Sequence, residues 1–145
     1  MSHLLVAGQF LLIALLAWPF TAPSFSPFSL AACLLLLGAG AAIALAATAA
    51  MGKDTVSVLP EPRTGGRLVT RGIYRHVRHP MYLAVLLCAL AACLAYQSGM
   101  KWGLAALLAA LLAVKIRREE RLLRQRYPDY AAYARRTRAL LPFVF

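Results

Sequence analysis

The sequence GIYRHVRHPMY, residues Gly72 to Tyr82, separates a polar, basic segment from a long apolar run. Pro80 stands where the apolar run begins, and proline suits the first turn of a helix because the N–H that it lacks would have no partner there. We therefore expect a helix to begin at Pro80. The residue before proline is pushed out of the α region, so His79 is expected to be extended. His79 and the free N–H groups of this helix start would then be able to bind an anionic group.

The composition is that of a membrane protein rather than of a soluble domain, because 61% of the 145 residues are hydrophobic. The net charge is +11, but every Lys and Arg except Lys101 lies in one of two blocks, Lys53–Arg78 and Lys115–Arg138. Each block adjoins an apolar run. This placement predicts contact with anionic membrane lipids, and it argues against a nucleic-acid partner.

Four apolar runs predict an all-α bundle that spans the membrane as a single domain over residues 1–145. The expected spans are residues 4–20, 29–50, 80–97 and 101–118. The apolar part of the fourth run is short, so its helix is expected to continue past Lys115, with Lys101 and Lys115 extending toward the two membrane surfaces. Residues 97–101 are expected to form the turn before that helix. Gly38 and Gly40 are expected to let another helix approach the second span closely.

The charge of the connecting segments predicts the orientation in the membrane. Both basic blocks fall in the loop 51–79 and the tail 119–145, with only the start of the second block inside the fourth span. Positively charged segments stay in the cytosol, so the loop, the tail, both termini and the active site are expected there, in a multi-pass protein of the inner (cytoplasmic) membrane. In the tail, Tyr127, Tyr130 and Tyr133 recur every three residues before several arginines, which is typical of an interfacial helix.

Glu119 and Glu120 are the only adjacent acids in the chain. In one interpretation they belong to a solvated helix face, where Glu120 pairs with Arg117 and Arg124 at helical spacing. In the other they are functional, because their helix leaves the membrane on the side that also holds His79. No metal site is expected, because the histidines of the central stretch lack a third ligand.

Together these residues resemble the isoprenylcysteine carboxyl methyltransferase family, whose pattern the phospholipid methyltransferases share. The matching positions are Leu68–Tyr74, Arg78–Tyr82, Glu119, Glu120, Tyr130, Tyr133, Leu141 and Pro142. The resemblance covers roughly residues 52–142. It implies an integral membrane enzyme that uses S-adenosylmethionine to methylate a lipophilic small-molecule or lipid-modified acceptor.

The resemblance also implies a cytosol-facing cofactor pocket. Most of the cofactor-binding residues are assigned by the resemblance, and two neighbours, Arg78 and Glu120, are added for their charge. The full set is Gly66, Arg67, Leu68, Val69, Tyr74, Arg78, His79, Pro80, Met81, Tyr82, Glu119 and Glu120. Lys115, one helical turn before the acidic pair, would contact the acceptor. Similar prenylcysteine enzymes have arginine there, and lysine cannot make the two parallel bonds that guanidinium makes to a carboxylate. No catalytic residue is assigned.

The chemistry of the cofactor agrees with these residue types. Glutamate can accept hydrogen bonds from its ammonium or ribose hydroxyls, and Arg78, His79 or the helix start after Pro80 can hold its carboxylate. Methyl transfer depends chiefly on alignment of donor and acceptor. A carboxylate acceptor needs no base, whereas an amine or a thiol must first lose a proton.

The leading hypothesis is O-methylation of a carboxylate. The alternatives are methylation of a phospholipid or of another amine or thiol and, from other classes, a nicotinamide-dependent membrane reductase or a non-catalytic scaffold. The sequence leaves the acceptor and the oligomeric state open.

Overall fold

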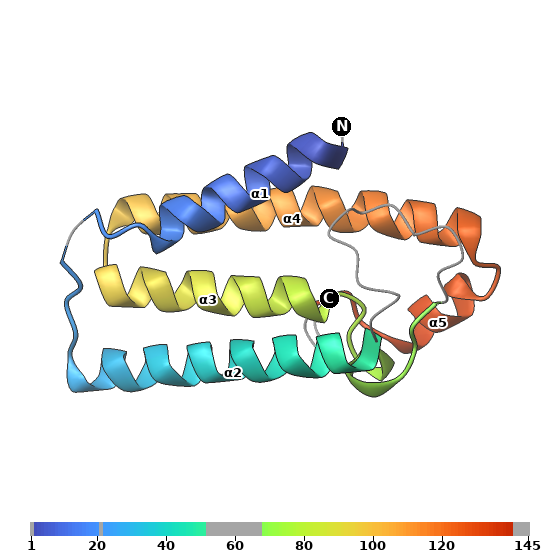
Figure 1. The fold of residues 1–145 in the computed structure, drawn as a ribbon, viewed down its shortest axis with the longest axis horizontal. Coiled ribbons are helices and arrows are strands. Elements are labelled where there is room, and N and C mark those ends of the chain that lie inside the picture. Colours follow the sequence, from blue (N-terminus) through green and yellow to red (C-terminus); the bar gives the residue numbers. More distant parts are fainter. Residues whose placement is uncertain (1, 21, 52–67, 141–145) are drawn as a thin grey trace.

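The computed structural model describes residues 2–20, 22–51 and 68–140, and the regular elements in this part of the chain are all helices. The elements are α1 (Ser2–Ala17), α2 (Pro27–Met51), the 3₁₀ helix η1 (Gly72–Arg75), α3 (Pro80–Tyr96), α4 (Gly99–Arg126) and α5 (Tyr130–Arg136). The four longer helices run side by side, and η1 and α5 lie together at one end of the bundle (Figure 1). The predicted all-α class is confirmed.

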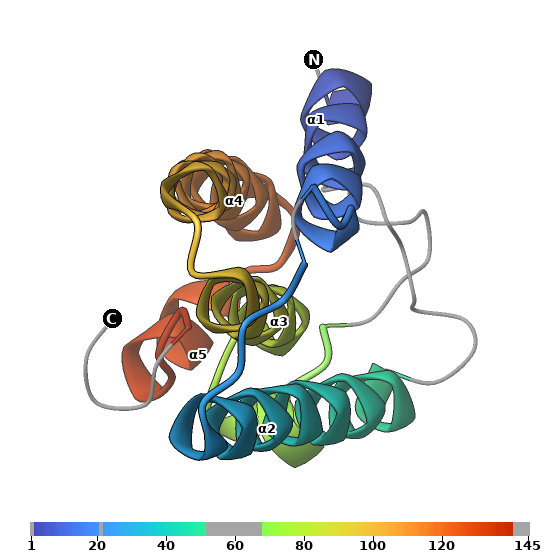
Figure 2. The same cartoon turned by 90° about the vertical axis from the view of Figure 1, so that its left-hand side faces the viewer.

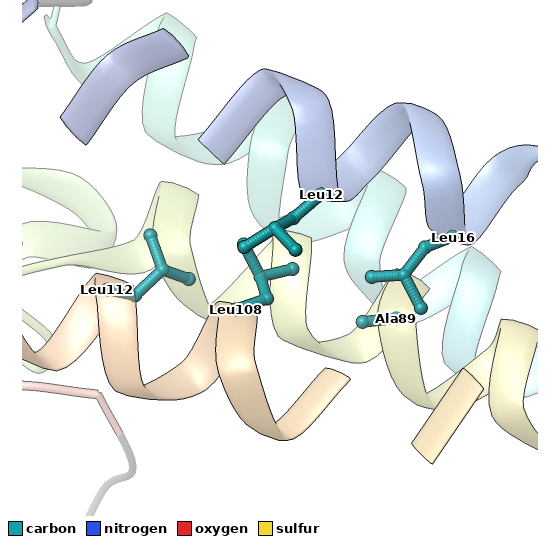
Figure 3. Close-up of a cluster of buried hydrophobic side chains, with 5 residues drawn as sticks. All are labelled: Leu12, Leu16, Ala89, Leu108 and Leu112. Atoms are coloured by element: carbon teal, nitrogen blue, oxygen red, sulfur yellow. The ribbon is translucent and has the colours of Figure 1, made fainter. Parts of the chain in front are cut away.

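The helix α3 is the centre of the bundle. It packs against α2 on one side and α4 on the other, while α1 lies along α4 (Figures 1 and 2). Where α1, α3 and α4 meet, a cluster of apolar side chains is buried (Figure 3). Its members are Leu12, Leu16, Ala89, Leu108 and Leu112. The short Ala89 side chain leaves room for the leucines of the two flanking helices.

Two helices are long and apolar enough to cross a membrane: α2 with 25 residues and α4 with 28. The helices α1 and α3 are also apolar but have only 16 and 17 residues. Within the most apolar window of α2, 17% is buried inside the protein, so leucines such as Leu34 and Leu35 face outward. A helix that is apolar all round and still exposed is stable in lipid but not in water. The protein is therefore a membrane helical bundle, and the count of four spans stays a prediction.

The contact between α2 and α3 depends on Gly40. A Cβ atom at this position would lie 3.2 Å from the Ala84 carbonyl oxygen and 3.3 Å from the Cys88 Sγ. At Gly38 a Cβ atom would meet nothing within 4 Å. The predicted close approach of helices is thus confirmed at Gly40, and Gly38 takes no part in it.

The connection between α3 and α4 is shorter than expected. Because α4 already begins at Gly99, only Gln97 and Ser98 form the turn, and Gln97 ends α3 in the left-handed conformation with φ 46°. The helix α4 continues past Lys115 to Arg126, as predicted. It is about 42 Å long, so its last turns extend beyond its apolar part.

The expected positions of the two lysines of α4 are wrong, because neither side chain reaches the surface. Lys101 is 0% exposed and Lys115 is 1% exposed. The Lys101 Nζ donates to the carbonyl oxygens of Leu15, Leu16 and Trp18 at 3.1, 2.7 and 2.6 Å. The last carbonyl groups of a helix have no partner within it and carry negative partial charge, so a buried cation is stable there. Lys101 therefore fastens the C-terminal end of α1 to α4.

Candidate functional site

The start of α3 is held by the C-terminal tail. Pro80 is the first residue of the helix, and His79 before it has φ −123° and ψ 59°, outside the α region as expected but not fully extended. The backbone N–H groups of Arg78 and His79 donate to the carbonyl oxygens of Arg138 and Ala139 at 2.8 and 3.0 Å. These bonds belong to a short parallel pairing of the two segments. The tail thereby fixes the backbone just before the helix.

The side chain of Arg78 joins α3, α4 and α5. Its Nε donates to Glu120 Oε1 at 2.7 Å, and both side chains are 13% exposed. Its Nη1 donates to the carbonyl oxygen of Ala134 at 3.0 Å and to that of Thr137. A guanidinium group can bind several acceptors at once because its donors point in fixed, divergent directions. Arg78 is therefore a buried link between the acidic pair and the tail.

His79 and Tyr82 bind the acidic pair from the first turn of α3. The His79 ring places Nε2 3.4 Å from Glu120 Oε1 and Nδ1 3.7 Å from Glu119 Oε2. The Tyr82 hydroxyl donates to Glu119 Oε2 at 2.9 Å. The rings of His79 and Tyr82 are stacked, with centroids 5.5 Å apart. The two side chains thus hold both carboxylates in fixed positions.

Glu120 is an interior ion-pair partner rather than part of a solvated helix face. Burial raises the pKa of Glu120, but hydrogen bonds from His79 and Arg78 outweigh burial and bring the pKa to about 2. The expected helical pair with Arg124 is present at 3.5 Å, although the Arg124 side chain is 61% exposed. Exposed pairs of this kind contribute little, so Arg78 is the important partner.

Tyr74 lies next to the acidic pair, on the η1 side. Burial, followed by the nearby Tyr133 and Glu119, raises the pKa of Tyr74 to about 12, so its hydroxyl keeps its proton. The Tyr133 hydroxyl donates to the Tyr74 carbonyl oxygen at 2.7 Å. Val69 packs with Tyr74 against the C-terminal end of α2, and Leu68 beside it is half-buried.

The structure thus unites part of the predicted cofactor site. The predicted residues joined by direct side-chain contacts are Arg78, His79, Tyr82, Glu119 and Glu120. Pro80 supplies the helix start on which they depend. Met81 instead lines an apolar groove along α3. Gly66 and Arg67, like the tail positions Leu141 and Pro142, lie outside the described residues.

Lys115 lies close to this group and has a partner that the sequence analysis missed. Its Nζ donates to Gln9 Oε1 at 2.6 Å and lies 5.0 Å from the centre of the Tyr82 ring. Gln9 comes from α1, far away in the sequence, and is 8% exposed. The sequence contained a signal for this contact: Gln9 is an amide within an uncharged apolar run, and a polar side chain in a membrane helix needs a partner.

Comparison with known families agrees with this geometry. The family model described as phospholipid methyltransferase matches residues 28–130. The matched range contains the start of α3 and the acidic pair of α4. The chain belongs to the phospholipid methyltransferase family. Members of this family are membrane methyltransferases of the phospholipid and isoprenylcysteine type, and such enzymes generally use S-adenosylmethionine.

The chain is also similar to a protein whose name refers to metal resistance. The cobalt-zinc-cadmium resistance protein CzcN of Cupriavidus metallidurans is 40% identical over 81 residues. The match covers 55% of this chain and 38% of CzcN, so the chain spans little more than a third of that relative. In the part of the chain that the structure describes, no three His, Cys, Asp or Glu side chains form a group that could hold a metal ion.

The residues at this site fit the chemical groups of S-adenosylmethionine. Glu119 Oε2 accepts the hydrogen bond from the Tyr82 hydroxyl, whereas Glu119 Oε1 accepts none from the described residues. That oxygen can accept from an ammonium or a ribose hydroxyl. The Tyr130 hydroxyl is a buried polar atom without a protein partner among the described residues. Buried polar groups normally have partners, so this hydroxyl can bind a water molecule or a ligand.

Proposed function

We propose that this protein transfers a methyl group from S-adenosylmethionine to the carboxylate of a lipophilic acceptor in the membrane. The observation that carries the proposal is the side-chain group at the start of α3. There His79 and Tyr82 bind Glu119 and Glu120, and Arg78 pairs with Glu120. In a membrane protein of this family, five polar side chains that are buried or half-buried together at the end of the bundle are best explained by a binding site.

The residues of this group would bind and orient rather than react. Bound S-adenosylmethionine supplies a methyl group that is already activated for transfer. Glu119 Oε1 would accept hydrogen bonds from the cofactor's ammonium or ribose, while Tyr82 and His79 keep the carboxylate in place. Arg78 would keep the tail closed over the site through its bonds to α5 and Thr137. Holding the reactants in line and excluding water accounts for much of the rate in such a transfer.

Two features favour a carboxylate as the acceptor. Lys115 is a buried cation without an ion pair among the described residues, so an anionic group would be bound and an ammonium group repelled. Both ring nitrogens of His79 face carboxylates, so neither is directed at an acceptor molecule. A carboxylate acceptor needs no such base.

An apolar groove supports a lipophilic acceptor. The groove has a volume of about 680 Å³ and lies along α3, lined mainly by small and aliphatic side chains of the four long helices. Met81, next to the polar group, and Tyr96, at the other end of α3, both line it. An acceptor chain lying in the groove would place its polar end near His79 and Tyr82.

The charge distribution supports a cytosolic site. Among the described residues, the arginines before α3 and those after residue 115 belong to η1 and its neighbours, the C-terminal part of α4 and α5, and these segments lie at the same end of the bundle (Figure 1). Under the positive-inside rule this end faces the cytosol, which gives four spans in an inner membrane with both termini on the cytosolic side.

A second candidate is N-methylation of phosphatidylethanolamine, favoured by the description of the matching family. The name of CzcN refers to metal resistance and favours neither acceptor over the other. The two candidates predict products of different chemical stability. A methyl ester releases methanol in mild base, whereas an N-methyl group does not.

The proposal is tested first by calorimetry of S-adenosylmethionine binding to the protein in detergent, alongside Glu119→Gln and the exposed control Arg126→Gln. We expect binding in the wild type and the control, and a loss of about tenfold or more in Glu119→Gln. Absence of binding in a folded wild type would refute the proposal. Incubation of membranes with methyl-labelled cofactor, followed by base treatment, then decides between ester and amine products.

A further inference from the structure

Gln9 is a buried polar residue in the apolar helix α1, and it contacts Lys115 next to the site. The side chain lies midway along an apolar helix, 8% exposed, and its Oε1 accepts a 2.6 Å hydrogen bond from Lys115 Nζ. The family match covers residues 28–130 and therefore excludes α1. The bond joins a helix outside the shared family region to a residue next to the acidic pair.

Contacts on the C-terminal side of Gln9 fix the position of α1. Lys101 binds the carbonyl groups at the C-terminal end of the helix, and Leu12 packs on α4 between the two lysine contacts. Figure 3 shows Leu12 against Leu108 of α4. Two buried lysines on one face of α4 thus hold α1 in a single register.

The Lys115 ammonium has no ion pair within the described residues, and the nearby Glu119 carboxylate, one helical turn further along α4, is bound by Tyr82. One of its three N–H groups donates to Gln9, whose amide is neutral, and the face of the Tyr82 ring lies 5.0 Å away. The described residues provide no ion pair for it. A cation removed from water without an ion-pair contact is costly, and an anionic ligand beside the ammonium would lower that cost.

We propose that Gln9 is a specificity-determining residue for the acceptor: with Lys115 it forms a carboxylate-binding end of the acceptor site. This inference rests on the proposed methyltransferase function. Gln9 Oε1 orients the ammonium above Tyr82, and the remaining N–H groups of Lys115 and the Nε2 group of Gln9 donate to the carboxylate. A neutral amide is essential to this role, because glutamate at the same position would itself supply the counter-charge.

Three variants separate this role from simple packing. Gln9→Leu removes the bond to Lys115. Gln9→Glu keeps an oxygen at the same place but neutralises the cation. The control Leu12→Ala weakens the packing of the same helix face without touching either lysine. Each variant is assayed for methyl transfer to an S-farnesyl cysteine carboxylate and for S-adenosylmethionine binding.

We expect KM for the carboxylate acceptor to rise about tenfold in Gln9→Leu and at least as much in Gln9→Glu, with kcat and cofactor affinity unchanged. Leu12→Ala should lower the melting temperature and leave KM as in the wild type. A structural role would give the opposite pattern, with a wild-type KM in Gln9→Glu or a raised KM in Leu12→Ala. Either result would overturn the inference.

A measurement without methyl transfer keeps this inference separate from the proposed function. Dodecanoate is expected to raise the melting temperature of the detergent-purified wild type more than dodecylamine does, and Gln9→Glu is expected to lose the difference. A wild type that binds no S-adenosylmethionine but shows this difference would refute the methyltransferase proposal and retain the carboxylate site. Equal shifts with both probes in the wild type would refute the carboxylate site.

Discussion

Arg78 Nε donates a 2.7 Å hydrogen bond to Glu120 Oε1, although the two residues are 42 positions apart in the sequence. The bond connects a residue two positions before the start of α3 with the part of α4 that extends beyond its apolar run. Because both side chains are largely buried, the pair is part of the interior and not of the arginine-rich surface around it. His79 contacts the same Glu120 oxygen, and Tyr82 stacks on His79, so the start of α3 is linked to the acidic pair through this bond.

Replacement of Arg78 by methionine is expected to destabilise the protein by about 3 kcal/mol, because it leaves the buried Glu120 carboxylate without its main partner. Thermal unfolding in detergent measures the effect. Arg75→Met is the matched control, since Arg75 is exposed and belongs to the neighbouring η1. Equal stability of the two variants would contradict the importance of the Arg78–Glu120 pair.

Glu120 is expected to make the protein sensitive to acid. Its pKa is depressed from an ordinary value of 4.5 to about 2 in the folded protein. Its stabilising contribution is therefore complete above about pH 4.5 and is lost as the pH falls through about 2. In Glu120→Gln, the difference in melting temperature from the wild type should shrink steadily between these pH values. A difference that does not change with pH would show that the charge of Glu120 is unimportant.

Tyr82→Phe isolates the hydrogen bond to Glu119. The variant keeps the stack on His79 and the aromatic face below Lys115, but removes the 2.9 Å bond to Glu119 Oε2. We expect S-adenosylmethionine to bind about tenfold more weakly, as for loss of one hydrogen bond to a charged group. Tyr96→Phe, at the opposite end of α3, should bind as the wild type does. Calorimetry measures both, and unchanged affinity in Tyr82→Phe would separate this bond from cofactor binding.

The glycines of α2 offer a paired test of helix packing. Gly40→Val would force side-chain atoms against the Ala84 carbonyl oxygen and Cys88 Sγ, and should cost about 1–3 kcal/mol. Gly38→Val introduces the same side chain two residues away, where a Cβ atom has no neighbour within 4 Å, and should be nearly neutral or stabilising. Thermal unfolding compares them. Similar losses at both positions would show that helix propensity, not the α2–α3 contact, governs the effect.

The features that depend on local chemistry are predictable from the amino-acid sequence. Apolar run length predicted the helices, Pro80 predicted the start of α3, and the shortness of the fourth apolar run predicted that α4 continues past Lys115. The motif from Arg78 to Tyr82 with the acidic pair predicted the family. These inferences succeed because helix starts, spans and motifs are encoded by neighbours in the chain.

Contacts between side chains that are distant in the sequence depend on how the helices pack, and the sequence did not predict them. The sequence suggested helical neighbours for Glu120, whereas its main partner, Arg78, belongs to another element. It suggested that Lys101 and Lys115 reach outward, whereas both turn inward to acceptors on α1. A long polar side chain in an apolar bundle donates a hydrogen bond to an acceptor that has no other partner, and the packing of the helices determines where that acceptor lies.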